Sequence, residues 1–377
     1  MRPLRLLAAV TGSPRLLGTQ HAAPPFSLSG AGGTAPAPDR PPVRARLRAW
    51  AELLRVSALF TVPGDALAGA AAAGRRPGRG TALAVGASLC LYEAGMALND
   101  WADREEDAVD RPHRPIPSGR VTPGAALVAA GALTAAGLAL AARAGRPALA
   151  VASGLAATVW AYDLHLKHTK LGPAAMASAR TLDLLLGATA TATAAGAGTA
   201  GAGTAGASTA GGEAAPAARS AAGPGASRAA RGPSAALPAA LVLGAHTYAV
   251  TAVSRHEAHG GSTVAPLAAL AGVAGLGAAV LRGRSTPGEP PRTPATAERL
   301  LLPAFAGAYL RTSAVPLLHA ALNPSPPLTQ RAVGGGIRAM IPLQAALAAR
   351  AGAPIGGLAV MGLVPLARAL ARKVSLT

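Results

Sequence analysis

Long apolar stretches alternate with short polar or proline-rich breaks along most of this chain. Stretches such as Ala125–Ala142, Ala148–Ala161 and Leu267–Leu281 contain no charged residue. A helix that crosses a bilayer needs roughly 20 mostly apolar residues, and glycine or proline stands at most of the breaks. The pattern predicts helices over residues 50–73, 80–98, 123–142, 147–163, 172–195, 236–254, 263–282, 299–321, 330–349 and 354–372. We therefore expect an all-α fold, a polytopic transmembrane bundle of nine or ten helices.

Three stretches fall outside this pattern. Residues 1–45 are rich in Arg, Pro, Ala and Gly and predict a disordered N-terminal tail, which leaves 46–377 as one transmembrane domain. Within that domain, residues 196–233 are an Ala/Gly/Thr/Ser tract broken by prolines, which indicates a flexible insertion between two helices. Residues 283–297 predict a proline-rich linker.

Composition supports the membrane prediction and excludes a nucleic-acid partner. The chain has 377 residues, of which 51% are hydrophobic and 14% charged, against about 25% charged in an ordinary soluble domain. The formal net charge of +19 comes from arginines scattered through loops and tails, and aromatic residues make up only 3%, too few for base-stacking platforms. Basic residues beside apolar spans suit anionic lipid headgroups instead. We expect an integral, multi-pass protein of a bacterial plasma membrane.

Acidic residues gather where the second apolar segment ends. Six of the 16 acidic residues fall between positions 100 and 110. On one helix, Asn99, Asp103 and Asp107 would lie at i, i+4 and i+8, with Asp110 three residues further along the same face. Carboxylates aligned in this way repel one another unless a cation lies between them. A hard divalent cation such as Mg²⁺ binds carboxylates and substrate phosphates together, so the face predicts a magnesium site.

The segment that follows is rigid and basic, which suits a phosphate ligand. Residues 111–120 read RPHRPIPSGR, in which the prolines end the helix and stiffen the loop. Arg114 and Arg120 could offer guanidinium groups to phosphate oxygens. The alternative is a solvated acidic cap followed by a proline turn.

Together, Asn99–Arg120 closely resembles the first signature of the UbiA-type intramembrane prenyltransferases, an NDxxDxxxD helix followed by an RPxRPxPSGR-like loop. The resemblance runs from about Arg44 to the C-terminus, apart from the insertion. It implies a nine-helix bundle with a central cavity open to lipid. It also implies transfer of an isoprenyl group from a Mg²⁺-bound prenyl diphosphate to an acceptor whose identity the sequence leaves open.

Further residues gain roles from the same resemblance. Tyr162 and Lys167, in the segment YDLHLK, look like the Tyr/Lys segment after the family's fourth helix, and Lys170 follows closely. Arg55 matches a position where the family often has a basic residue near the diphosphate. The resemblance thus implies that the diphosphate is bound by Asn99, Arg55, Arg114, Tyr162, Lys167 and Lys170. Two of these, Asn99 and Arg114, belong to the first motif. It implies metal binding by Asn99, Asp103, Asp107 and Asp110.

The second acidic motif departs from the family pattern. Typical members have three carboxylates after the sixth helix, whereas Ser254–Gly261 keeps one, Glu257. This puts a complete second Mg²⁺ site in doubt, although the segment is similar to an EboC-like actinobacterial and cyanobacterial subgroup. Asp103, Asp107 and Glu257 are the expected catalytic residues. Arg180 and Asp183, at i and i+3, are expected to form a self-neutralising pair inside the bundle.

Two other functions are compatible with parts of this pattern. A CDP-alcohol phosphotransferase also has aspartates at helical spacing, but its motif, with Asp-Gly and Ala-Arg pairs ahead of a GxxxDxxxD end, is missing here. A non-catalytic carrier of a prenylated or precursor molecule would tolerate the reduced second motif. Release of pyrophosphate from a labelled prenyl diphosphate distinguishes the enzyme from such a carrier.

Overall fold

A computed structural model of the chain describes residues 42–202, 232–282 and 296–365. Most of the predicted tail, insertion and linker, and the end of the last predicted helix, lie outside these described residues. Every regular element within them is helical, which confirms the predicted all-α fold.

The helices have the following bounds. In chain order they are α1 (Val43–Leu53), η1 (Val56–Thr61), α2 (Pro63–Ala72), α3 (Arg79–Ala102), α4 (Arg104–Asp110), α5 (Pro123–Ala144), α6 (Arg146–Ala161), η2 (Tyr162–Leu166), α7 (Gly172–Ala202), η3 (Pro233–Ala236), α8 (Leu237–Ser254), α9 (Val264–Leu281), α10 (Thr296–Leu322), α11 (Pro326–Arg350) and α12 (Pro354–Met361). Seven helical stretches of the described chain are long and apolar enough to cross a membrane, and Leu59–Ala72 and Pro354–Pro365 are shorter apolar helices. The protein is therefore an integral, multi-pass membrane protein.

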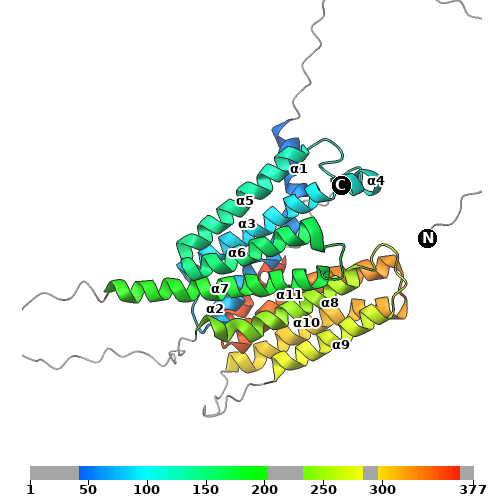
Figure 1. Cartoon of the computed structure of the whole chain (residues 1–377). Helices are drawn as coiled ribbons and strands as arrows, with labels where there is room; N and C mark the ends of the chain where they lie inside the picture. Colours follow the sequence, from blue (N-terminus) through cyan, green and yellow to red (C-terminus); the bar gives the residue numbers. More distant parts are fainter. Residues whose placement is uncertain (1–41, 203–231, 283–295, 366–377) are drawn as a thin grey trace, which may run out of the picture. The chain divides into compact units, whose positions relative to one another are not determined.

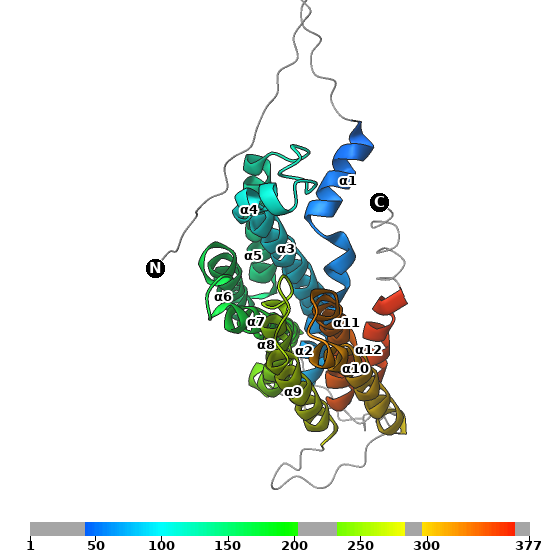
Figure 2. The same ribbon diagram turned by 90° about the vertical axis from the view of Figure 1, so that its right-hand side faces the viewer.

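The bundle has two groups of helices joined through α7. Helices α3, α5 and α6 lie together, and α8, α9 and α10 form the other group (Figure 1). Helix α7 packs on α6 on one side and on α8 on the other, while α11 packs against α10, α8 and α2. Helices α1 and α4 lie at the same end of the bundle (Figure 2). This end carries the acidic segment.

Two glycines allow α2 and α7 to cross at close range. A Cβ atom on Gly69 would lie 2.2 Å from the backbone oxygen of Leu184, and one on Gly187 would lie 2.4 Å from the Cα of Ala66. Small residues are what permit backbones to approach in membrane bundles. The crossing brings the start of α2 next to the middle of α7.

The first predicted helix, 50–73, is divided in the structure, so this prediction was wrong. Helix α1 ends at Leu53, and Arg55 adopts a left-handed conformation with φ 49° and ψ 44° before the 3₁₀ helix η1. Pro63 then occupies the first turn of α2, where its missing N–H costs nothing. The break separates a polar helix at the end of the bundle from an apolar one inside it.

Three other boundaries differ from the predictions. Helix α1 already begins at Val43, inside the predicted tail, and α7 continues to Ala202, inside the predicted insertion. Alanine is the best helix former, which explains why the Ala-rich start of the insertion extends α7. The predicted segment 330–349, with its three glycines and Pro342, lies in one longer helix, α11. Gly335 and Gly336 lie close to Pro316 and Val250, so these glycines serve helix packing.

Candidate functional site

The acidic segment is divided between the end of α3 and the short helix α4, so it does not form one continuous helical face. Helix α3 ends at Ala102, Asp103 has φ −88° and ψ 5°, and α4 starts at Arg104. A backbone hydrogen bond of 2.8 Å from Asp107 N to Asp103 O keeps the turn tight. Because the helix bends at Asp103, the predicted alignment of four side chains on one face was wrong.

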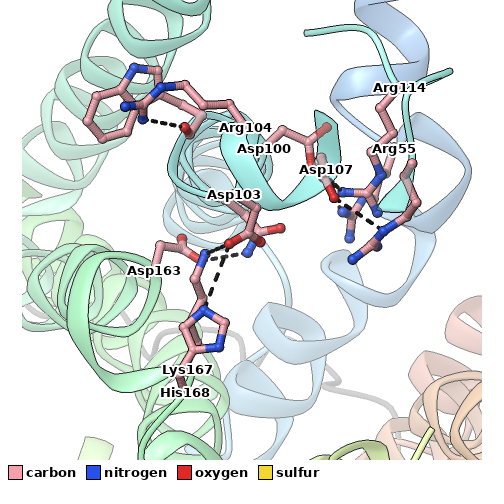
Figure 3. A network of polar contacts seen from close by, with 12 residues as sticks. Arg55, Asp100, Asp103, Arg104, Asp107, Arg114, Asp163, Lys167 and His168 are labelled. Carbon is pink, nitrogen blue, oxygen red and sulfur yellow. Dashed lines mark hydrogen bonds and ion pairs between the residues drawn. The ribbon is translucent and has the colours of Figure 1, made fainter. Parts of the chain in front are cut away.

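Asp107 and Asp100 point towards arginines. Asp107 is 1% exposed and accepts a 2.6 Å hydrogen bond from Arg114, while Arg111 Nε lies 3.2 Å from its other oxygen. Arg114 also reaches Asp100 at 3.4 Å, and Arg55 donates to Asp100 at 3.1 Å. Figure 3 shows the guanidinium groups of Arg55 and Arg114 beside these carboxylates. The proline-rich loop after α4 therefore supplies cations to the motif that precedes it.

Asp103 points to a different set of partners. Lys167 donates a hydrogen bond to Asp103, and His168 Nε2 lies 3.9 Å from the same carboxylate oxygen. Figure 3 shows Lys167 and His168 on the side of Asp103 away from Arg55 and Arg114. Asp103, Glu106 and His168 each offer one ligand atom, and these atoms lie within 4.8 Å of one another. Among the residues that the structure describes, these three lie close enough together to hold a metal ion.

A π-helical turn completes this end of the bundle. Helix α6 passes into the turn η2, which begins at Tyr162 and is followed by Lys167. Within it, Asp163 is buried and accepts a 3.2 Å hydrogen bond from Asn99. Single π-turns occur often at functional sites, and here the turn aims Tyr162, Asp163 and Lys167 towards the end of α3.

A cavity of about 210 Å³ extends from this polar end into the bundle. Helix α3 lines it with one face, on which residues recur every three or four positions from Ser88 to Asn99. Helices α6 and α7 close it, and Arg55 joins from the break after α1. The walls between its ends are mostly apolar, with Leu91, Tyr92, Gly95, Met96, Leu155, Val159, Ala175, Met176 and Ala179.

The far end of the cavity is polar again. Arg180 and Asp183 from α7 and Ser88 from α3 all line it. Arg180 donates a 2.6 Å hydrogen bond to Asp65, which is fully buried, and lies 3.9 Å from Asp183. The predicted Arg180–Asp183 pair is thus present, but Asp65 is the closer partner of the guanidinium.

Several predicted site residues lie outside this arrangement. Asp110 and Lys170 are exposed, and neither makes an ion pair within the described part of the chain. Arg120, which the sequence suggested for phosphate, donates to both carboxylate oxygens of Glu52, at 2.6 and 3.1 Å. This bond lowers the pKa of Glu52.

Glu257 lies in the turn after α8 and does not line the cavity. Partial burial raises the pKa of this carboxyl. Its neighbour Arg255 donates to the backbone oxygen of Thr169. The second-motif segment therefore contacts the loop that follows Lys167, but Glu257 has no hydrogen bond to the first motif among the described residues.

The structure also brings in residues that the sequence prediction left out of the site. These are Asp100, Glu106, Asp163 and His168. Each stands next to a predicted site residue in the sequence. Helical spacing favoured the neighbours of Asp100 and Glu106, and the family resemblance favoured the neighbours of Asp163 and His168. The bend at Asp103 and the π-turn change which positions face inward, and neither feature is visible as a repeat in the sequence.

Comparisons with known proteins agree with this architecture. The model of the UbiA prenyltransferase family matches residues 58–282, more than half of the chain. The digeranylgeranylglyceryl phosphate synthase of Methanopyrus kandleri is 38% identical over 130 residues, which are 33% of this chain and 46% of that protein. The match thus spans less than half the length of this curated relative. This relative is named as a digeranylgeranylglyceryl phosphate synthase, so the comparison supports the family and not the EboC-like subgroup expected from the sequence.

Solved structures show the same fold. One solved structure concerns digeranylgeranylglyceryl phosphate synthase in membranes. It aligns with this chain with a TM-score of 0.52 at 14% identity, over 81% of this chain and 98% of that one. The apo structure of a UbiA homolog from Aeropyrum pernix K1 aligns with a TM-score of 0.51 at 15% identity, over 81% of this chain and 97% of that one. At these identities the likeness concerns the fold alone.

Proposed function

The chain belongs to the UbiA prenyltransferase family, and from this premise we propose that it transfers an isoprenyl group from a prenyl diphosphate to an acceptor inside the membrane. The observation that carries the proposal is the cavity, which runs from Asn99, Asp163 and Arg55, next to the first acidic motif, to apolar walls between α3, α6 and α7. A prenyl diphosphate has the same division, since its head is anionic and its tail is a hydrocarbon.

A magnesium ion suits the carboxylates at the polar end. Asp103 and Glu106 offer oxygen atoms within 4.8 Å of each other, and Mg²⁺ prefers carboxylate oxygens and substrate phosphates. Asn99, whose amide oxygen is not used in its bond to Asp163, could add a third oxygen. When bound, the ion would neutralise charge that develops on the leaving diphosphate. Asp107 pairs with Arg114 and Arg111, and its role as a metal ligand, like that of Asp110, stays a prediction from the sequence.

Cationic side chains of the chain itself would bind the rest of the diphosphate. Lys167 is 10% exposed and contacts Asp103, so a phosphate that enters beside Asp103 would meet its ammonium group. Arg55 lines the cavity and keeps 39% of its side chain exposed. Tyr162 lines the same end and can donate its hydroxyl to a phosphate oxygen. Charge-assisted bonds of this kind stabilise the leaving group as its negative charge increases.

The apolar walls would hold the isoprenyl chain and exclude water. Leu91, Met96, Leu155, Val159 and Met176 line the middle of the cavity. A dry site protects an allylic cation from capture by water until the acceptor attacks. The bond between C1 of the isoprenyl group and the diphosphate oxygen breaks, and the diphosphate leaves with the bonding electron pair. C1 forms a new bond to the acceptor atom, whose proton passes to the released diphosphate.

The acceptor and the membrane are further parts of the proposal. The name of the Methanopyrus relative refers to a geranylgeranylated glyceryl phosphate, which supports an acceptor with a hydroxyl group. The bacterial plasma membrane and the EboC-like subgroup stay predictions from the sequence, as do the roles of Glu257 and Lys170.

The experiment that tests the proposal follows pyrophosphate release. Purified protein is incubated with labelled geranylgeranyl or farnesyl diphosphate, Mg²⁺ and a lipid extract of the source cells. We expect labelled product and pyrophosphate with the wild type, and a loss of about 100-fold or more with Asp103→Ala, because a charge-stabilising group at the leaving diphosphate is removed.

Glu105→Ala is the matched control for this experiment. Glu105 belongs to the same acidic segment, but its side chain is 85% exposed and pairs with Arg104 alone among the residues that the structure describes. Its substitution should leave turnover unchanged. Binding of the diphosphate without release of pyrophosphate would instead identify a carrier, and equal turnover by wild type and Asp103→Ala would refute the assignment of the site.

A further inference from the structure

Helix α1 (Val43–Leu53) exposes apolar side chains, although it is not one of the seven candidate spans. Val43 is 71% exposed and Leu47 is 64% exposed. The two side chains lie one turn apart on the same face of the helix. A different face of α1 packs on the bundle, because Ala49 and Leu53 are buried. The strip formed by Val43 and Leu47 is therefore left uncovered by the part of the chain that the structure describes.

Arginines border this apolar strip on both sides. At 3.6 residues per turn, Arg44 lies about 60° beyond Leu47 around the helix axis, and Arg46 lies about 60° before Val43. Both arginines are exposed, and neither makes an ion pair with another described residue. The acidic residue of α1, Glu52, is already paired with Arg120. The exposed part of α1 is thus apolar along one strip and cationic on either side of it.

The three tryptophans of the chain indicate the depth at which α1 lies. Trp50 of α1, Trp101 of α3 and Trp160 of α6 all pack against one cluster that contains Ala49 and Leu53. Each of the three is partly exposed. Tryptophan is enriched where a membrane protein passes from the hydrocarbon to the headgroups. Figure 2 shows α1 at one end of the bundle, so α1 lies at the membrane–water interface.

Helix α4 lies at the same end and provides a contrast. Val109 of α4 is 81% exposed, more than either apolar residue of the α1 strip. Its neighbours Glu105, Glu106 and Asp110 are exposed and acidic, and an anionic lipid surface would repel them. Exposed apolar area is therefore common to both helices, whereas the basic border belongs to α1.

We propose that α1 is an interfacial anchor, in which Val43 and Leu47 enter the acyl region and Arg44 and Arg46 bind the headgroups of anionic phospholipids. Amphipathic helices with arginine beside an apolar strip bind membrane surfaces in this way. The long apolar stem of arginine lets the charged group reach the headgroups. Each basic residue near an anionic surface strengthens the binding by about a factor of five. The contact involves the lipid matrix and not the substrate, so it holds whether or not the protein transfers an isoprenyl group.

An environment-sensitive fluorophore on the strip tests the anchor. The full-length protein with Cys90→Ser and Leu47→Cys is labelled and placed in nanodiscs of phosphatidylcholine, with or without phosphatidylglycerol. With phosphatidylglycerol, we expect blue-shifted emission and strong quenching by lipids that carry a nitroxide on the acyl chain. Both effects should be weaker in phosphatidylcholine alone. High salt should also weaken them, because it screens the headgroup charge.

Two controls accompany this measurement. Val109→Cys in the same Cys90→Ser background should carry a label that stays in water in both kinds of nanodisc. Arg44→Gln combined with Arg46→Gln should lower the ratio of inserted to solvent-exposed label at position 47 by about tenfold or more. Arg76→Gln combined with Arg79→Gln also removes two exposed arginines, but these precede or begin α3 at its other end, so this variant should leave the ratio unchanged.

Two results would exclude an anchor on anionic lipid. One is a label at position 47 that is as exposed to water as the label at position 109 when phosphatidylglycerol is present. The other is a label at position 47 that is shielded equally in both kinds of nanodisc and responds neither to salt nor to the Arg44 and Arg46 substitutions. In that case a protein segment or a second copy of the chain would cover the strip.

Discussion

Arg114 donates a 2.6 Å hydrogen bond to Asp107, a residue only 1% exposed. Asp107 belongs to α4, and Arg114 lies within the proline-rich loop that follows this helix. Their contact ties the loop back onto the helix, and Arg111 Nε lies 3.2 Å from the other carboxylate oxygen of Asp107. This explains how a dense run of carboxylates can fold at the end of α3 without strong repulsion.

Asp107→Ala should therefore lower the stability of the fold, and any loss of activity should follow from that. Removal of one partner from a buried ion pair leaves the other uncompensated, which costs about 3 kcal/mol. We expect a clear decrease in the thermal midpoint in detergent, compared with no change for Glu105→Ala. A variant that is as stable as the wild type but inactive would show that Asp107 acts on the substrate instead.

The sequence predicted the membrane bundle and the end at which its site lies, because both depend on features that repeat or cluster. Apolar stretches of sufficient length define the spans, and the carboxylates of residues 100–110 define the site. The orientation of single side chains was harder to predict. The left-handed Arg55 and the bend at Asp103 each change which neighbours meet, and neither appears as a repeat in the sequence. Asp65 illustrates the same limit, since no motif in the sequence linked it to Arg180, 115 residues away.

Substitutions of Lys167 can distinguish a role in substrate binding from a purely structural role. Lys167→Met should lower kcat/KM for the prenyl diphosphate by about 100-fold, because a charge that faces the leaving group is lost. Lys167→Arg should recover part of this activity, since the charge returns in a different shape. Steady-state kinetics at saturating Mg²⁺ measures both variants. Full activity of Lys167→Met would show that Lys167 only neutralises Asp103.

The Glu52–Arg120 pair predicts a small dependence of stability on pH. The hydrogen bond from Arg120 lowers the pKa of Glu52, so the pair stabilises the fold above the ordinary carboxyl pKa of about 4.3. Its contribution is lost as the pH falls through the lowered pKa of Glu52. Both side chains are more than a third exposed, which limits the effect to below about 1 kcal/mol.

Thermal unfolding from pH 7 to pH 3 checks this sign with Glu52→Gln as the comparison. The wild type should be slightly more stable than the variant near neutral pH, and the difference should disappear at the acid end. A difference that grows as the pH falls would contradict the pairing.

The crossing of α2 and α7 gives the sharpest structural prediction. Gly69→Ala would place a Cβ atom 2.2 Å from the backbone oxygen of Leu184, and a backbone atom cannot move aside as a flexible side chain can. The two helices would have to separate, which would pull Asp65 away from Arg180 and open the far end of the cavity. We expect Gly69→Ala to fold poorly or to lose a large part of its thermal stability.

Gly131→Ala on α5 is the control for this prediction. A Cβ atom at Gly131 meets nothing within 4 Å, so this variant should be neutral or slightly stabilising, because alanine favours a helix over glycine by about 1 kcal/mol. Equal thermal midpoints for the two variants, measured in one detergent, would show that α2 and α7 do not need this close approach.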